Sequence, residues 1–319
     1  MKEFIEIKNK IEESESIILT AHINPDGDAV GSSLSLFLSL KEKYKNKKIN
    51  LILQDVIPYT TKFLKGSECF EIYDKEKKYF CDLLIFLDSA TKERTGETGK
   101  NIEAKFTINI DHHVSNPLYG DINCVIPTAS STSEIIYHFL KEQEFDFLPA
   151  ANDALYLGLV NDTGNFSHSN VKYETMLMAT DLISKGVNNN YIVSNFLNSN
   201  SYQSLKLLGE ALKNFEFYPE KKLVYYFLDA ETQKKYSAKK EDTEGLVEKL
   251  LSYYEASVSL FLREETDTKK IKGSMRSKYE VDVNKIANIF GGGGHYKAAG
   301  FSSDLKAEEI LKIVMENIK

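Results

Sequence analysis

A stretch that ends in an acid and two imidazoles, KFTINIDHH at residues 105–113, constrains the fold most strongly. Its apolar residues alternate with other residues in the pattern of a buried β-strand: Phe106, Ile108 and Ile110. Three ionisable residues follow where that strand ends: Asp111, His112 and His113. In an open α/β sheet, ligands bind at this edge. A helix cap followed by two solvated histidines would have the same sequence. Asp-His-His alone therefore does not establish a ligand site, and other stretches of the chain are needed.

A second strand-like run, SIILTA at residues 16–21, ends in His22. A Pro-Asp-Gly turn follows, before an apolar-periodic helix expected over residues 29–44. Asp26 and Asp28 flank that turn, where Asp often caps a helix. The alternative is a divalent-metal site, because one imidazole and two carboxylates on a tight loop form a suitable donor set.

Two further acids follow apolar segments. The strand expected over residues 82–87, DLLIFL, ends at Asp88. A largely apolar helix expected over residues 150–160 stops near Gly164, which leaves Asp162 at a buried helix end. A buried carboxylate is costly unless it is paired or binds a metal. Since alternating strands and helices give parallel pairing with right-handed crossovers, these strand ends are expected to converge at one edge.

The C-terminal part adds chemistry suited to anions. A strand expected over residues 270–275 is followed by Arg276 and Ser277. Their guanidinium and hydroxyl groups are both suited to binding phosphate. The segment GGGGHYKAAG at residues 291–300 begins with four glycines. Because glycine has no Cβ, ligand oxygens could reach the main-chain N–H groups of this turn. A flexible loop is the plain alternative. The candidate substrate-binding residues are Arg276, Ser277, Gly292, Gly293, Gly294 and His295.

Composition limits the class of protein. The chain has 319 residues, of which 42% are hydrophobic and 27% charged, as in an ordinary soluble protein with room for two cores. A formal charge of −7 disfavours binding to long nucleic acid. The three cysteines form no CxxC pair and are expected to be reduced thiols of a cytoplasmic protein. No apolar run approaches the roughly 18 residues of a membrane span.

The order of expected elements predicts an α/β fold with two domains. A larger N-terminal domain, residues 1–190, would carry a mainly parallel sheet flanked by helices and the metal site. A helical linker at residues 191–214 would lead to a smaller C-terminal α/β domain at residues 215–319 that binds substrate. The active site is expected in the cleft between the two domains.

Five motifs in this order resemble the DHH phosphoesterase superfamily. They are HINPDGDAVGS, the Asp88-Ser89 strand end, Asp111-His112-His113, NDTGNF, and RSK with the distal GGGGHYKAAG. Within the superfamily the chain is most similar to the bifunctional oligoribonucleases and phosphoadenosine-phosphate phosphatases, the nanoRNases of NrnA type. The resemblance covers nearly the whole chain. It departs from the pattern at Asn161, where relatives often carry Thr, and at the polar Ser167-His168 pair.

The resemblance implies a centre of two metal ions bridged by Asp88. The other implied ligands are His22 and Asp26 for one ion, and Asp28, His112 and Asp162 for the second. Mixed imidazole and carboxylate donors suit Mn²⁺, with Mg²⁺ or Co²⁺ as substitutes. Water shared by two ions could attack a phosphate in line. His113 would contact that phosphate, and Asp111 would orient a neighbouring imidazole.

The implied substrates are short oligoribonucleotides, linear dinucleotides or 3′-phosphoadenosine 5′-phosphate, without long duplexes or membranes as partners. The sequence does not decide the oligomeric state, and a homodimer is one alternative. Three other functions share parts of the pattern: a RecJ-like single-strand exonuclease, an inorganic pyrophosphatase and a non-catalytic nucleotide sensor. The acidic net charge disfavours the exonuclease. The glycine segment disfavours the pyrophosphatase, and the complete set of metal ligands disfavours the non-catalytic sensor.

Overall fold

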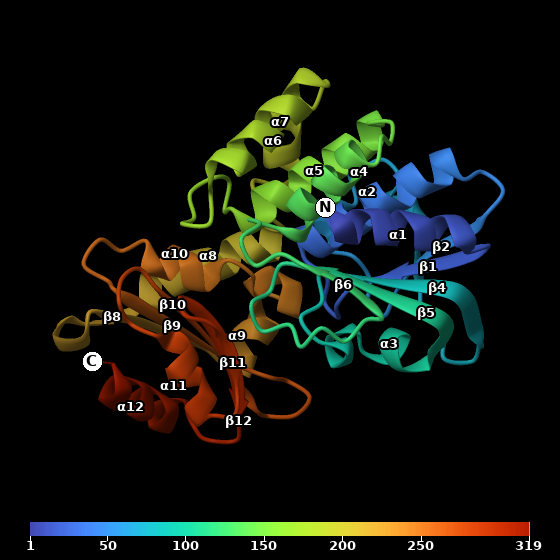
Figure 1. Ribbon diagram of the computed structural model, residues 1–319. Coiled ribbons are helices and arrows are strands. Elements are labelled where there is room, and N and C mark those ends of the chain that lie inside the picture. Colours follow the sequence, from blue (N-terminus) through green and yellow to red (C-terminus); the bar gives the residue numbers. More distant parts are fainter. Residues whose placement is uncertain (319) are drawn as a thin grey trace. The chain divides into compact units, whose positions relative to one another are not determined.

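Six parallel strands form the sheet of the N-terminal unit in the computed structural model, which describes residues 1–318 (Figure 1). The strands are β1 (Ser16–Thr20), β2 (Lys48–Leu53), β3 (Phe70–Ile72), β4 (Tyr79–Leu87), β5 (Ile102–Asp111) and β6 (Ile122–Val125). They lie in the order β3-β2-β1-β4-β5-β6, and every neighbouring pair is parallel. The predicted mainly parallel sheet is confirmed.

This strand order creates a switch point between β1 and β4. From β1 the chain moves outward to β2 and β3, then returns to the other side of β1 to form β4, β5 and β6. Connections leave β1 and β4 in opposite directions, so the carboxyl ends of these two strands border an open crevice, the usual ligand site of such sheets.

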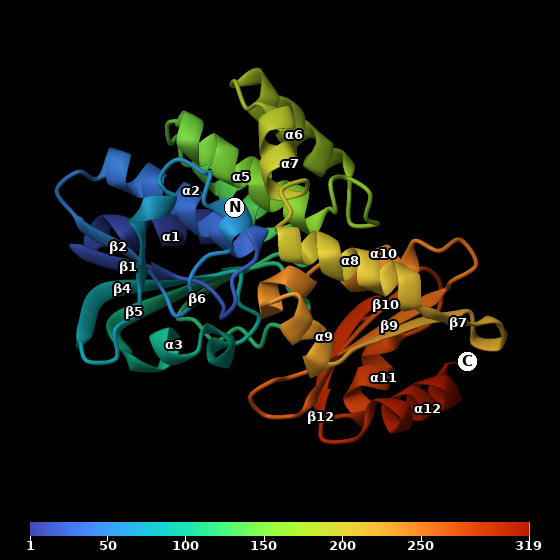
Figure 2. The same cartoon turned by 180° about the vertical axis from the view of Figure 1, so that it is seen from behind.

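Helices cover the two faces of this sheet unequally. Figure 1 shows α2, α4 and α5 on one side and α3 on the other, and Figure 2 shows the same separation of α2 and α5 from α3. The helices of this unit are α1 (Lys2–Glu13), α2 (Gly27–Lys43), α3 (Glu97–Asn101), α4 (Thr132–Glu142), α5 (Pro149–Asp162), α6 (Tyr173–Ser184) and α7 (Asn189–Phe196). The larger core lies under the helix-rich face, and a smaller cluster around Phe86 fills the face of α3. Among the described residues no helix is both long and apolar enough to span a bilayer.

Two glycines let α2 and α5 pack antiparallel at very short range. A Cβ placed on Gly31 would lie 2.4 Å from the carbonyl oxygen of Ala154 and 2.9 Å from the backbone nitrogen of Gly158. One turn earlier, a Cβ on Gly27 would lie 2.8 Å from the Cβ of Asn161. The start of α2 is therefore held against the end of α5, which brings Asp28 and Asp162 together.

The second unit begins at Asn200 and carries a mixed sheet. Its strands are β7 (Glu216–Tyr218), β8 (Leu223–Leu228), β9 (Val258–Glu264), β10 (Ile271–Ser277), β11 (Gly293–His295) and β12 (Ala298–Ser303). They lie in the order β11-β12-β10-β9-β8-β7, and β8–β9 is the parallel pair. Helices α8 (Tyr202–Asn214) and α10 (Leu246–Leu251) pack on one face, and α11 (Val283–Ile289) and α12 (Ala307–Asn317) on the other. The remaining helix is α9 (Ala230–Lys235).

One local expectation differs from the structure. Part of the expected glycine loop forms β11, because Gly293, Gly294 and His295 pair with β12. Within residues 191–214, α7 buries Ile192 in the core of the first unit and α8 buries Leu207 in the core of the second.

Gly31→Ala should destabilise the N-terminal unit. Ala has the higher helix propensity, but the new methyl group would overlap the backbone of α5, and overpacking of this kind costs about 1–3 kcal/mol. Urea unfolding of the N-terminal unit measures the change. The matched control is Gly209→Ala in α8, where no atom lies within 4 Å of the added Cβ. An equal unfolding midpoint for Gly31→Ala and the wild type would contradict the close packing of α2 and α5.

Candidate active site

Three neighbouring strands deliver the predicted site residues to the switch point. His22 follows β1, Asp88 follows β4, and β5 ends in Asp111 before His112 and His113. The backbone of Asp88 has a positive φ of 50°, which is uncommon for a residue other than glycine. Its N–H donates to the carbonyl of Ile110 at 3.0 Å, so the turn is fixed to the end of β5.

His22, Asp26 and Asp88 form a first group of possible metal ligands. Nε2 of His22 lies 3.8 Å from Oδ1 of Asp26 and 3.5 Å from Oδ2 of Asp88. The other ring nitrogen, Nδ1, donates to the carbonyl of Ile23 at 2.8 Å, which directs Nε2 toward the carboxylates. Asp26 also caps α2 by accepting from the N–H groups of Asp28 and Ala29, and this role as a helix cap is compatible with its place in the group of possible metal ligands.

Asp28, His112 and Asp162 form a second group. Nε2 of His112 lies 3.1 Å from Oδ2 of Asp162. The buried carboxylate of Asp28 accepts from two main-chain N–H groups at the start of α4, those of Thr132 at 2.6 Å and Ser133 at 2.9 Å. The first turn of α4 therefore holds Asp28 in place.

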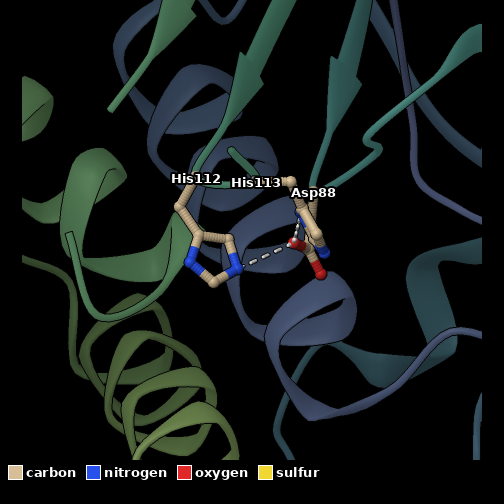
Figure 3. Close-up of side chains that lie close together, drawn as sticks. All are labelled: Asp88, His112 and His113. Atoms are coloured by element: carbon tan, nitrogen blue, oxygen red, sulfur yellow. Dashed lines mark ion pairs between the residues drawn. The ribbon is translucent and has the colours of Figure 1, made fainter. Parts of the chain in front are cut away.

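Asp88 lies between the two groups, with its carboxylate oxygens facing different ones. Oδ2 faces His22 of the first group. Oδ1 lies 3.7 Å from Nε2 of His112 and 3.8 Å from Nδ1 of His113 (Figure 3). A carboxylate placed in this way can share its two oxygens between two cations.

His113 is oriented by Asp111. Nδ1 of His113 donates to Oδ1 of Asp111 at 2.7 Å, so the nitrogen that faces Asp88 is already engaged. Asp111 is fully buried, and its second oxygen accepts from Nδ2 of Asn116 at 2.7 Å. The hydrogen bonds and charge of His113, with the Asn116 hydrogen bond, outweigh burial and lower the pKa of Asp111. Asp111 is thus suited to positioning the imidazole rather than to proton transfer.

Electrostatics indicate that the centre lacks positive charge. Burial, together with the charges of Asp162 and Asp88, raises the pKa of Asp28 well above its ordinary value. Burial also raises the pKa of Asp162. Burial would lower the pKa of His112, but the hydrogen bond and charge of Asp162 outweigh it and raise that pKa to about 10. Protons therefore compensate the clustered carboxylates, and a divalent cation would do so better. The donor set fits such an ion.

In the second unit, the strand register places two of the predicted substrate residues in one row. Arg276 of β10 pairs with Ala298 of β12, and Ala298 pairs with His295 of β11. Paired residues share a face of the sheet, so the small side chain of Ala298 lies between Arg276 and His295, whose backbones are about 10 Å apart. Nε of Arg276 donates to Glu248 at 2.8 Å. The Ser277 hydroxyl donates to the carbonyl of Val281 at 2.7 Å, so in this arrangement its proton is already used.

The glycines of the predicted loop differ in their structural roles. A Cβ on Gly292 would lie 2.3 Å from the carbonyl oxygen of Gly300, and one on Gly294 2.4 Å from that of Ala298. These two glycines are required for packing against β12. A Cβ on Gly293 would meet nothing closer than 3.7 Å, so this is the glycine with space above its main chain.

Comparisons with known proteins agree with this arrangement. The model described as "DHH family, N-terminal domain" matches residues 16–159, and the model "DHHA1 domain" matches residues 220–319. A bifunctional oligoribonuclease and PAP phosphatase NrnA from Thermus thermophilus is 31% identical over 95% of this chain and 90% of its own length. The chain belongs to the DHH family.

Further relatives extend over the whole chain. The NrnA protein of Bacillus subtilis is 30% identical over 90% of this chain and 89% of its own length. An exopolyphosphatase-related protein from Bacteroides fragilis has a solved structure that matches with a TM-score of 0.92 at 29% identity, covering 99% of this chain and 95% of its own. The resemblance inferred from the five motifs and the α/β fold are confirmed.

In this DHH protein two polar residues of the site, Thr132 and Asn116, were not predicted as functional. The hydroxyl of Thr132 donates to Oδ1 of Asp88 at 3.1 Å, and Asn116 holds Asp111. Hydroxyl residues such as the run SSTS at residues 130–133, where α4 begins, are typical of helix caps, and Asn116 lies in an irregular loop. His138 lies beside Tyr137 on α4 and joins none of the possible metal-ligand groups found among residues 1–318. Nδ1 of His168 donates to the carbonyl of Asp162 at 3.1 Å.

The proton on His112 should stabilise the metal-free DHH protein in a pH-dependent manner. Because the folded pKa of about 10 exceeds the ordinary value of 6.5, the contribution is fully present below pH 6.5 and is lost as the pH rises through 10. His112→Gln removes it, so the stability difference between wild type and variant should shrink between pH 6.5 and 10. Urea unfolding with chelator present measures this difference. A difference that stays constant would contradict the assigned pairing of His112 with Asp162.

Proposed function

We propose that this protein is a metal-dependent phosphoesterase that hydrolyses short oligoribonucleotides and linear dinucleotides to mononucleotides and removes phosphate from 3′-phosphoadenosine 5′-phosphate. The relatives from Thermus thermophilus and Bacillus subtilis are named for oligoribonuclease and PAP phosphatase activity, and they align over most of this chain. The observation that carries the proposal is the carboxylate of Asp88, whose two oxygens face two separate groups of metal-ligating side chains.

Two cations fit these groups. We infer that His22 and Asp26 bind one ion, that Asp28, His112 and Asp162 bind the other, and that Asp88 bridges them. Imidazole and carboxylate donors in this mixture favour Mn²⁺, with Mg²⁺ or Co²⁺ as substitutes. The chemistry supplied by divalent cations in such a centre is activation of water and neutralisation of phosphate charge.

The other residues of the site act on the substrate and on each other. Asp111, whose pKa is lowered by His113 and Asn116, accepts a hydrogen bond from Nδ1 of His113 and so fixes the orientation of its ring. His113 can then offer its second nitrogen, Nε2, to an oxygen of the phosphate that is cleaved, where negative charge develops. The main-chain N–H groups of Thr132 and Ser133 keep Asp28 oriented throughout.

Arg276 and His295 are proposed to bind another phosphate of the substrate. A guanidinium is suited to bidentate contact with phosphate, but Glu248 must release Nε of Arg276 for this geometry. The face of the main chain at Gly293 has room for a phosphate oxygen, since nothing lies within 3.7 Å of the position of a Cβ. Ser277 is proposed to contribute by accepting a hydrogen bond, because its proton is held by Val281.

Substrate choice and metal dependence test the proposal together. The purified protein with Mn²⁺ should release mononucleotide from 5′-phosphorylated diadenylate and phosphate from phosphoadenosine phosphate, and chelator should abolish both activities. Asp88→Asn should lower kcat by about 100-fold or more, since loss of an outer contact to a metal ligand alone costs about 10- to 100-fold. Asn also tolerates the positive φ of this position, so the backbone is retained.

A long single strand and pyrophosphate serve as the competing substrates. Preference for the long strand would favour an exonuclease of RecJ type, and preference for pyrophosphate a pyrophosphatase. No turnover of any of the four substrates would favour a nucleotide sensor. Undiminished turnover by Asp88→Asn would contradict the bridging role of Asp88.

Arg276→Ala should separate binding from chemistry. Because Arg276 is proposed to contact a phosphate remote from the bond that breaks, KM should rise about 10-fold or more, as loss of a charged hydrogen bond of about 1.5–3 kcal/mol predicts, with little change in kcat. Steady-state kinetics with diadenylate measure both constants. The charge-matched control is Lys312→Ala on α12, which packs against the opposite face of the sheet. A fall in kcat with unchanged KM would assign Arg276 to the chemical step instead.

A further inference from the structure

Thr132 is a buried residue that contacts both sets of proposed metal ligands. Its main-chain N–H donates to Oδ2 of Asp28 at 2.6 Å, and its hydroxyl donates to Oδ1 of Asp88 at 3.1 Å. Thr132 is 0% exposed and Asp88 is 3% exposed, so neither contact competes with bulk water. One residue thus fixes the spacing between a ligand of the second group and the carboxylate that faces both.

The hydroxyl contact differs from the other contacts of Asp88. The imidazoles of His22, His112 and His113 approach its oxygens to 3.5, 3.7 and 3.8 Å, beyond ordinary hydrogen-bond distance. The Thr132 hydroxyl lies within that distance and carries no charge, so it does not compete with a cation for the carboxylate. Its Cβ is branched, which restricts the rotamer of the hydroxyl.

The position of Thr132 in the fold gives this contact its rigidity. Ser131 caps α4 by accepting from the N–H of Glu134 at 3.1 Å, which leaves Thr132 as the first helical residue. The first turn of α4 is buried throughout. Asp88, in contrast, sits in a turn with a positive φ of 50° that only its surroundings can maintain. A rigid helix start therefore orients a strained turn.

We propose that Thr132 is a positioning residue that sets the orientation of the Asp88 carboxylate, and with it the affinity for the second cation; this rests on the proposed function of Asp88 as the bridging ligand. Removal of the hydroxyl leaves the main-chain contact to Asp28 intact, so the defect is confined to Asp88. Without this hydrogen bond the carboxylate of Asp88 can rotate, so that Oδ2 no longer always faces His22 and Oδ1 no longer always faces His112.

Thr132→Val and Thr132→Ser test this role. Val keeps the branched shape and removes the hydroxyl, whereas Ser keeps the hydroxyl. Calorimetric titration with Mn²⁺ should show two sites in the wild type, with one site weakened about 10- to 100-fold in Thr132→Val and restored in Thr132→Ser. The Mn²⁺ concentration for half-maximal turnover of diadenylate should rise in parallel, while KM for diadenylate at saturating Mn²⁺ stays unchanged.

The matched control is Thr61→Val, which removes another fully buried Thr hydroxyl, one that donates to Pro58 and lies in a 3₁₀ turn of the same unit. It should leave Mn²⁺ binding unchanged. Equal Mn²⁺ binding by Thr132→Val and wild type would overturn the role of Thr132, as would equal weakening in Thr132→Ser. A wild type that binds no Mn²⁺ would instead overturn the proposed metal centre, so the two failures are distinguishable.

Discussion

The buried negative charge at the switch point of the first sheet is the constraint on which the rest of the site depends. Asp28, Asp88 and Asp162 are held close together, and burial together with their mutual repulsion raises the pKa of Asp28. Such a cluster persists only where donors surround it or a cation binds. The fold supplies donors from the start of α4 and imidazoles from the ends of β1 and β5, and it places all of them at the switch point, the usual ligand site of such sheets.

Close helix packing follows from the same constraint. Asp28 lies in the first turn of α2 and Asp162 in the last turn of α5, so the two acids meet only if the helices run antiparallel at short range. Gly27 and Gly31, one turn apart on α2, remove the side chains that would keep α5 away. Gly158 acts on the site directly, because a Cβ there would lie 2.6 Å from Oδ1 of Asp28. These glycines shape the candidate metal site although none of them offers a ligand atom from a side chain.

The features that were predictable from the sequence are those encoded locally. Alternating apolar residues and turn signals located the ends of β1, β4 and β5, and parallel pairing then brought His22, Asp88 and His112 to one edge. Thr132 and Asn116 escaped prediction because a donor to a distant carboxylate has no characteristic spacing in the chain. The pairing of β11 with β12 was not predictable for the same reason. Gly292 and Gly294 are needed because the backbone of β12 lies close to them, and this contact has no signature in the local sequence.

In the metal-free protein, protons occupy the place that cations would take. The pKa of His22 is raised well above its ordinary value, because Asp26 and Asp88 outweigh the effect of burial, and that of His112 is raised to about 10. Ion binding must therefore displace protons from groups that already point at each other, so it exchanges one form of charge compensation for another and requires little rearrangement. The neutral Thr132 hydroxyl and the α4 amides would keep their contacts to Asp88 and Asp28 when an ion binds, since none of them needs to lose a proton. A centre built in this way keeps its geometry while its charge changes, which is the property that a shared carboxylate requires.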